Sequence, residues 1–532
     1  MQLNLISSQQ LKNCRRLYTK FGTALPYLLL TGVAVLTRFD SLSTDAGAWD
    51  EATFMLMAQD ILRGHLPYVF MFDNKPPGLF FIIAATQLVL GKSLLAVRIL
   101  SGISVLFSSF ICYKIAKKFT NTTYALLGSI FVILINSLNF GQELQSEQIA
   151  SFFILCALYC MVNFNFKMQN LLIGLFISLA VLCRSNLIIC AMATGVILLY
   201  FSLRKPKKQI GNNIILYILG GMTPVAILLY IYFTNKSLWY LKLAMIDVPS
   251  HYASERSFIQ LFVTNIHQAV IQAIISPGIF LLFIVISFLG LIISFIDFSK
   301  SKMSLSDRNI FIYNTMFISS IAVSIIIGGA FYNHYWLQLV PFLSIYISYA
   351  FDRLSAFRIS KYLPVIVTVI STAFALNAHA IKSLDVLFHL DTYESRYPLK
   401  RAANFISCAS NVNDRVWAVQ GHLVYWYLNI TPISPVATHP TNLVRQSIVN
   451  TLESAHYVSD NELERVMNSK PRFIIQAAKN IPFYLGGFGQ SYALWRDRNY
   501  DLWKSDPDFK IFVMRRSLNE LTSSQSLKMC GS

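Results

Sequence analysis

Two adjacent acids and one lysine are the first residues of this chain whose types and spacing suggest chemistry. Asp50 and Glu51 stand in "GAWDEATF", shortly after a long apolar run, and Lys75 follows in "FDNKPPGLFF". A carboxylate can take a proton from a hydroxyl group, and an ammonium group can balance the charge of a departing phosphate. The pairing provides the two parts that a group transfer from a lipid phosphate requires.

Helix geometry offers a simpler explanation of the same residues. Apolar side chains recur at helical spacing after the two acids, at Phe54, Met57, Ala58, Ile61 and Leu62. They predict an amphipathic helix on the membrane surface, ended by Gly64 and Pro67. Asp50 would then be the N-cap and Glu51 would lie in the first turn, where the helix dipole favours an acid. Lys75 could likewise extend toward lipid headgroups.

The composition is that of an integral membrane protein. The 532 residues are 55% hydrophobic and include 40 Phe and 26 Tyr, and the mean hydropathy is +0.52, which is too apolar for a soluble globular protein. The net charge of +18 comes from short basic clusters between apolar runs. This is the positive-inside pattern of membrane proteins, so we expect no nucleic acid partner. The N-terminus lacks a small-residue cleavage site and is predicted to be an uncleaved signal anchor.

Placing every basic cluster in the cytoplasm predicts eleven transmembrane helices. The spans are residues 21–37, 95–113, 120–140, 148–166, 168–183, 185–203, 212–233, 274–296, 309–330, 335–351 and 362–381. The apolar run 78–90 is too short to span and is predicted to be a re-entrant or interfacial helix. This topology places residues 38–94, residues 234–273 and the C-terminus on the outer side.

The chain divides into three parts under this topology. Residues 1–20 form a cytoplasmic N-terminus, residues 21–381 a transmembrane catalytic domain with surface helices in its first outer loop (38–94), and residues 382–532 a soluble outer domain. In this tail, strand-like runs ("RVWAVQ", "RFIIQAA", "FKIFVMRR") alternate with helical ones, and "SDNELERVM" fits a capping box at Ser459 and Glu462. We predict a small α/β domain, in which Cys408 and Cys530 could form a disulfide.

Polar residues that solubility does not explain gather on the outer side of the membrane. Besides the acids and the lysine already named, they include Glu143, Glu147, Arg184, Arg256 and His334. Ionisable residues at a membrane boundary commonly mark a functional site, and we predict one here. Arg184 and His334 could instead be snorkelling or hydrogen-bonding residues of the boundary.

The segment from Asp50 to Lys75 resembles a known family. The string "DEATF", a surface helix ending in Arg-Gly, and Lys-Pro-Pro followed by apolar residues are similar to the GT-C fold glycosyltransferases that use lipid-phosphate sugars. These include the protein O-mannosyltransferases of glycosyltransferase family 39 and the bacterial aminoarabinose transferase of lipid A. "SEQIASFFILCALY" and "NHYWLQLVPFL" look like two further outer segments of the family. The resemblance covers residues 20–380 and implies an α-helical polytopic GT-C fold, with an outer C-terminal domain as in bacterial members.

The resemblance also implies a donor and residue roles. The donor is expected to be a polyprenyl-phosphate sugar whose lipid tail lies against apolar helices. The implied roles are general base for Asp50, supported by Glu51; donor phosphate binding for Lys75 and Arg184; and substrate binding, for positioning of the donor, for Glu147. Glu143, His334 and Arg256 are predicted as further substrate-binding residues because they lie on the outer side of the membrane.

One position departs from the family. The aminoarabinose transferases commonly have an acid before Lys-Pro-Pro, and here that residue is Asn74. We therefore predict no obligatory metal ion and no other obligatory cofactor.

The expected location is the bacterial inner membrane, with the active site and the C-terminal domain on the periplasmic side. We expect the acceptor to be a hydroxyl of an envelope glycan or glycolipid of the lipopolysaccharide or lipid A type, with a protein acceptor as the alternative. A lipid flippase or solute transporter is the alternative from another class, although such proteins place ionisable groups near the membrane midplane. The chain has no P-loop and no HExxH motif, so neither nucleotide chemistry nor zinc hydrolysis is indicated.

Overall fold

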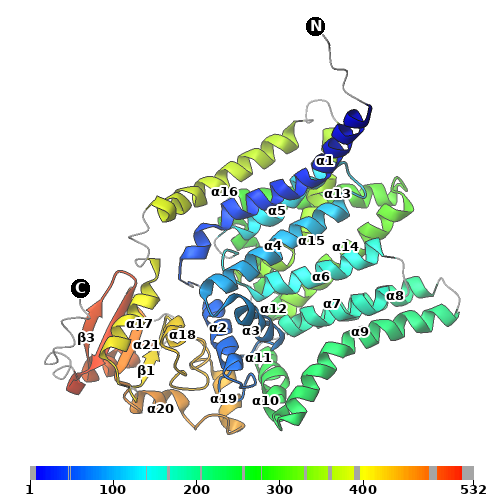
Figure 1. Cartoon of the computed structure of the whole chain (residues 1–532). Helices are drawn as coiled ribbons and strands as arrows, with labels where there is room; N and C mark the ends of the chain where they lie inside the picture. Colours follow the sequence, from blue (N-terminus) through cyan, green and yellow to red (C-terminus); the bar gives the residue numbers. More distant parts are fainter. Residues whose placement is uncertain are drawn as a thin grey trace.

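The computed structural model describes most of the chain. The described residues are 8–45, 47, 49–138, 141–164, 168–203, 207–254, 258–276, 278–328, 332–356, 362–388, 396–411, 413–478 and 488–517. They form a bundle of long helices, with a smaller α/β part beside one end of it (Figure 1).

The bundle consists of apolar helices. They are α1 (Ser8–Arg38), α4 (Leu94–Ala116), α5 (Thr122–Asn136), α6 (Ser146–Asn163), α7 (Gln169–Cys183), α8 (Ile188–Ser202), α9 (Lys207–Thr234), α13 (Gly278–Ser299), α14 (Leu305–Ile327), α15 (Val340–Ser355) and α16 (Leu363–Phe388). Each predicted span overlaps one of them. Among the described residues, six helices are long and apolar enough to cross a membrane, as expected of a multi-pass membrane protein. The full number of spans stays a prediction.

The helix that we predicted on the membrane surface is buried instead. α2 (Trp49–Leu62) lies with α3 (Gly78–Leu90) between the bundle and the C-terminal part (Figure 1). Residues 51–60 are all buried. The cause is cover by the C-terminal part: Thr53 Oγ1 donates to the carbonyl of Thr438 at 2.9 Å, and Gln59 Nε2 donates to Asn429 Oδ1 at 2.5 Å. The prediction of a surface helix is therefore wrong, whereas the helix predicted over 78–90 is present as α3.

A glycine brings α3 close to the end of α7. A β-carbon on Gly78 would lie 2.5 Å from the carbonyl oxygen of Leu182, so only glycine lets the two backbones approach this closely. Lys75 shortly precedes α3 and Arg184 directly follows α7. The contact therefore draws together two of the predicted site residues.

The outer segment 234–273 is largely helical. It contains α10 (Leu238–Lys242), a π-helical turn (Leu243–Asp247), α11 (Val248–Ser254) and most of α12 (Phe258–Ile275).

The C-terminal part contains a four-stranded sheet, which confirms the predicted α/β character. The strands are β1 (Val416–Ala418), β2 (Phe473–Ala477), β3 (Tyr500–Ser505) and β4 (Phe509–Met514). Their order is β1-β2-β4-β3, with β1 parallel to β2 and the other pairs antiparallel. The helices are α17 (Pro398–Ala409), α18 (Leu423–Leu428), α19 (Gln446–Ser454), α20 (Glu462–Asn468) and α21 (Phe488–Asn499). β1, β2 and β4 coincide with the predicted strand-like runs, and β3 was not predicted.

Two local predictions for this part have different outcomes. α20 follows Asn461, which has a φ of 56° and makes no side-chain cap. Glu462 instead pairs with Arg465 at 2.5 Å, so the predicted capping box is wrong. Cys408 is disulfide-bonded, but Cys530 lies outside the described residues, and the pairing of the two stays a prediction.

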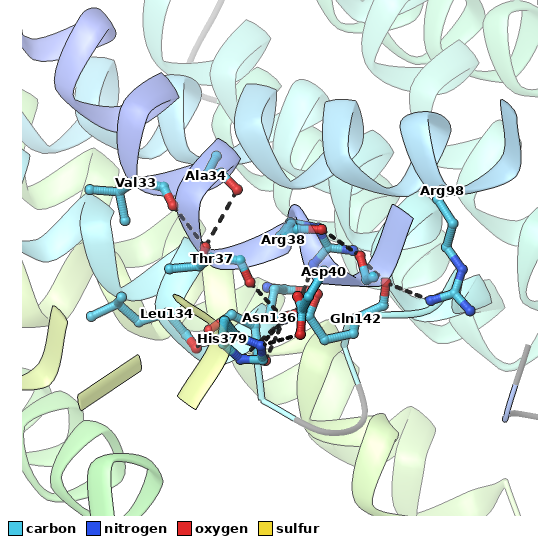
Figure 2. Close-up of polar contacts among 12 residues, drawn as sticks. Val33, Ala34, Thr37, Arg38, Asp40, Arg98, Leu134, Asn136, Gln142 and His379 are labelled. Atoms are coloured by element: carbon cyan, nitrogen blue, oxygen red, sulfur yellow. Dashed lines mark hydrogen bonds and ion pairs between the residues drawn. The ribbon is translucent and has the colours of Figure 1, made fainter. Parts of the chain in front are cut away.

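A buried polar network surrounds the end of α1 (Figure 2). Arg38, the last residue of α1, donates to the carbonyl of Asn136 at 2.8 Å and to that of Gln142 at 3.0 Å. His379 of α16 lies 2.9 Å from Asp40, measured from Nδ1 to Oδ2. The network thus ties α1 and α5 to the turn before α6. Because the predicted site acids at positions 143 and 147 lie in or just after this turn, the network fixes the backbone that carries them.

Candidate functional site

Asp50 and Lys75 form an ion pair. Lys75 Nζ donates to Asp50 Oδ1 at 2.7 Å, and the lysine and aspartate side chains are 21% and 18% exposed. α2 begins at Trp49, so Asp50 lies inside the first helical turn rather than at the predicted N-cap position. The hydroxyl of Tyr68 donates to the carbonyl of Lys75 at 2.5 Å, which holds the lysine backbone beside the helix.

The two charges of this pair stabilise each other. Burial alone would raise the pKa of the Asp50 carboxyl, but Lys75 and His439 hold this pKa well below its usual value. Burial alone would lower the pKa of Lys75, but Asp50 and Asp73 raise it above its usual value. Both members of the pair are therefore charged near neutral pH.

A second ion pair lies next to the first. Arg184, the residue after α7, pairs with Glu147 in the first turn of α6. Arg184 Nη1 also donates to Ser146 Oγ at 3.1 Å, and Ser146 Oγ donates to Glu147 Oε2 at 3.0 Å. Glu147 is fully buried, whereas the Arg184 side chain is 11% exposed. The acid is thus fixed by its partners, and the guanidinium group keeps some access.

His334 connects the two ion pairs. It lies in a 3₁₀ helix, η4 (Asn333–Gln338), and its Nε2 is 3.6 Å from Glu147 Oε1 and 3.9 Å from Asp50 Oδ2. The adjacent Tyr335 places its ring centroid 4.2 Å from the guanidinium carbon of Arg184. These contacts make the two pairs and His334 one continuous group.

The C-terminal part contributes a residue that the sequence analysis missed. His439 Nε2 lies 3.4 Å from Asp50 Oδ1, and His439 Nδ1 lies 2.9 Å from Thr441 Oγ1. Its ring meets that of Trp49 edge-on, with 5.9 Å between the centroids. A lone histidine in "ATHPTN" carries no motif, so only the folded chain reveals its place. The site is made jointly by the helical bundle and the C-terminal part.

Glu51 and Glu143 belong to a different set of contacts around Arg98. Glu51 Oε2 pairs with Arg98 Nη2 at 2.8 Å, and Glu51 Oε1 accepts the backbone N–H of Leu144 at 2.8 Å. Glu143 Oε1 lies 3.5 Å from Arg98 and accepts the backbone N–H of Gly47 at 2.7 Å. The Glu51 and Arg98 side chains are 0% and 1% exposed, and burial raises the pKa of Glu51 to about 7.

The predicted site residues therefore separate into two groups. The closed cluster consists of Glu51, Arg98 and Glu143. The open cluster consists of Asp50, Lys75, Glu147, Arg184, His334 and His439. The open cluster combines partly accessible cations with an ionised acid, which is the set of groups that can bind a phosphate and accept a proton.

Two predictions about the site stay untested. Arg256 lies outside the described residues. Within the described part of the chain, no group of three or more His, Cys, Asp or Glu side chains is arranged to hold a metal ion.

Comparison with known sequences identifies one family over part of the chain. The family described as dolichyl-phosphate-mannose-protein mannosyltransferase matches residues 74–241. This segment contains Lys75, Glu147 and Arg184 of the open cluster. No curated protein matches the chain in sequence.

Solved structures share the fold over most of the chain. ArnT from Cupriavidus metallidurans bound to undecaprenyl phosphate matches with 12% identity and a TM-score of 0.56, over 91% of this chain and 97% of that chain. Its apo state gives a TM-score of 0.57. The archaeal oligosaccharyltransferase AglB from Archaeoglobus fulgidus, in complex with an inhibitory peptide and a dolichol-phosphate, matches with 10% identity and a TM-score of 0.50, over 94% and 75%. The chain therefore shares the GT-C fold of these enzymes, and residues 74–241 match the mannosyltransferase family.

Proposed function

We propose that the chain transfers a sugar from a polyprenyl-phosphate donor to a hydroxyl group of an envelope glycan or glycolipid, at the outer face of the bacterial inner membrane. The open cluster carries this proposal, because Asp50 lies there beside two cations, Lys75 and Arg184, at partly accessible positions. The lipids in the matched structures, undecaprenyl phosphate with ArnT and a dolichol-phosphate with AglB, support a donor of this class.

The reaction in this proposal is a single inverting displacement. Asp50 takes the proton of the acceptor hydroxyl, whose oxygen attacks C1 of the sugar. The bond from C1 to the phosphate oxygen breaks as the new bond forms, and its electron pair leaves with the phosphate. Lys75 and Arg184 bind the phosphate, where negative charge increases in the transition state.

Donor binding activates the base in this scheme. Lys75 pairs with Asp50 in the structure and lowers the pKa of its carboxyl, which makes the aspartate a weak base. A donor phosphate that binds the Lys75 ammonium neutralises the positive charge that lies nearest to Asp50. The pKa of the Asp50 carboxyl therefore rises. Asp50 is then most basic when the donor is in place.

The other members of the open cluster hold these groups in position. Glu147 fixes Arg184 for the donor phosphate through their buried ion pair. His334 lies between Glu147 and Asp50, and His439 contacts the Asp50 carboxylate from the C-terminal part. A general base must lie within hydrogen-bond reach of the proton that it takes, and these contacts restrict the directions in which Asp50 can point.

Glu51 supports the base indirectly. Its contacts with Arg98 and with the backbone of Leu144 fix the first turn of α2, from which Asp50 extends. Glu143 acts in the same way through Arg98 and Gly47.

A glycan or glycolipid is our preferred acceptor. The match covers 97% of the ArnT chain but only 75% of the AglB chain. The chain, with its compact C-terminal part, therefore agrees better in extent with ArnT. A protein acceptor is the second candidate, because the family that matches residues 74–241 is described as protein mannosyltransferases.

Sugar transfer by the purified protein in detergent tests the proposal. No gradient exists in detergent, so a flippase or transporter would yield no new glycosidic bond. We expect mass spectrometry to detect a glycosylated envelope lipid when the protein is given a panel of polyprenyl-phosphate sugars, with the same yield after chelation of divalent ions. Absence of transfer across the panel would contradict the proposal, and rescue by a divalent ion after chelation would contradict metal independence.

A further inference from the structure

We propose that a second site, at the opposite end of the bundle, binds the phosphate group of an anionic membrane lipid. A cavity of about 350 Å³ lies between α1, α4 and α6. We call it the lysine cavity, and its characteristic lining residues are Lys114, Lys117, Lys118, Tyr27, Tyr113 and Tyr159. Its volume falls at the lower end of the range of about 300–1,000 Å³ that is typical of small-ligand sites.

The lining carries positive charge without an acid to balance it. None of the described residues that line the cavity is acidic. Lys114 Nζ lies 5.7 Å from the ring centroid of Tyr159, and Lys117 Nζ lies 5.9 Å from that of Tyr113. Aromatic rings, rather than carboxylates, therefore accompany these two ammonium groups. An anion in the cavity would supply the missing charge, and tyrosine hydroxyl groups can donate to its oxygens.

An apolar strip extends from the cavity along the bundle. The ring of Tyr27 contacts that of Phe110 with 5.1 Å between centroids, and Phe110 contacts Phe107 at 5.7 Å. Phe107 is 48% exposed, and Leu28, which follows Tyr27 on α1, is 56% exposed. An apolar surface that leads away from a cationic cavity fits the acyl chains and phosphate of one lipid molecule. This continuity favours a membrane lipid over a soluble phosphate.

The lysine cavity is separate from the candidate active site. Arg98 of the closed cluster and Lys114 of the cavity both lie on α4. They are 16 residues apart (114 minus 98), which corresponds to about 24 Å along a helix at about 1.5 Å per residue. Basic pockets between transmembrane helices on the cytoplasmic side bind anionic lipid headgroups in other membrane proteins, and our topology places Lys114 on that side.

Native mass spectrometry of the delipidated full-length protein tests this site. We expect wild type to bind one phosphatidylglycerol molecule more tightly than any further copies. The Lys114→Gln/Lys117→Gln variant should bind this first lipid at least tenfold more weakly. Lys118 is left unchanged because its Nζ donates to the carbonyl of Val162 at 3.0 Å. The matched control is Lys300→Gln/Lys302→Gln, which removes two exposed lysines elsewhere and should change binding less than twofold.

Three further arms distinguish the possible ligands and sites. Phosphatidylcholine, which has no net charge, should bind more weakly than phosphatidylglycerol, and free glycerol phosphate more weakly still. Lys75→Gln should leave the tight binding of the first phosphatidylglycerol molecule unchanged.

Equal binding by the cavity variant and wild type, or an equal loss in the control variant, would overturn the proposal. Glycerol phosphate binding as tight as that of the lipid would overturn the assignment to a membrane lipid. If the double variant does not fold, Lys117→Gln alone gives the same comparison.

Discussion

Asp50 and Glu51 are neighbours in the sequence, yet the ion pairs that they form differ in how accessible they are to a ligand. Asp50 lies in the open cluster and contacts Lys75, whose side chain is 21% exposed. Glu51 lies in the closed cluster and contacts Arg98, whose side chain is 1% exposed. A partly accessible ion pair can exchange one partner for a ligand, whereas a sealed pair cannot. This difference supports our proposal that Asp50 takes part in the chemistry and that Glu51 holds Asp50 in place.

The largest expected effect on stability comes from breaking the closed cluster. Arg98→Met leaves Glu51 and Glu143 without their buried cation, and removal of one partner from a buried pair costs about 3–5 kcal/mol. We expect a marked fall in the melting temperature, measured by differential scanning fluorimetry in detergent. The melting temperature of the double variant Glu51→Gln/Arg98→Met should fall less than that of Arg98→Met, because less uncompensated negative charge remains. A melting temperature of Arg98→Met equal to that of wild type would contradict the structural role of this cluster.

Loss of a phosphate-binding cation should have the next largest effect. Lys75→Gln removes a charge-assisted contact worth about 1.5–3 kcal/mol, so the transfer rate at low donor concentration should fall by about 10- to 150-fold. The melting temperature should change little, because Lys75 is partly exposed. Lys75→Arg, which keeps the charge, should retain more activity than Lys75→Gln. Equal activities of the two variants would count against a phosphate role.

A smaller effect is expected from the contact with the C-terminal part. His439→Gln removes the ring that lies beside Asp50. We expect kcat to fall by about tenfold, which is less than the contribution of about 10²–10⁴ from a general base itself, because His439 only helps to position the base. His456→Gln is the matched control, since this histidine is exposed in the same part of the chain. Identical kcat values for the two variants would show that His439 does not act on the base.

The smallest expected effect is a shift in the pH profile of kcat/KM. Asp50 must be ionised to accept a proton, and Lys75 holds its pKa well below the usual value. The wild-type profile should therefore show no loss from Asp50 down to the usual aspartate pKa of about 3.9. In Lys75→Gln the pKa of Asp50 rises, so the residual activity should begin to fall at a higher pH. An unchanged acidic limb would contradict the coupling between the two residues.

The sequence predicted the helical framework because the relevant signals are local. Apolar runs and the basic clusters between them located the long helices of the bundle, and the short run 78–90 was separated from the spans by its length and by the alternation of the basic clusters. The helices α10, α11 and α12 of segment 234–273 were not predicted. Strand-like runs likewise predicted β1, β2 and β4. None of these inferences required knowledge of which segments pack together.

The sequence could not predict how the site residues divide between clusters. Adjacent residues of a helix point about 100° apart, so Asp50 and Glu51 meet different neighbours, and those neighbours come from distant segments such as α4 and residue 439. Burial of α2 was missed for the same reason, because its cover is supplied by residues 429 and 438. His439 carried no motif at all.

The most direct test compares Asp50→Asn with Glu51→Gln in two measurements on the same preparations, the melting temperature and the rate of sugar transfer per folded molecule. We predict that Asp50→Asn keeps the wild-type melting temperature and loses transfer by a factor of about 10²–10⁴. Glu51→Gln should lower the melting temperature and reduce transfer less than Asp50→Asn does. Near-normal transfer by Asp50→Asn, or a larger loss of transfer in Glu51→Gln, would contradict the assignment of Asp50 as the base.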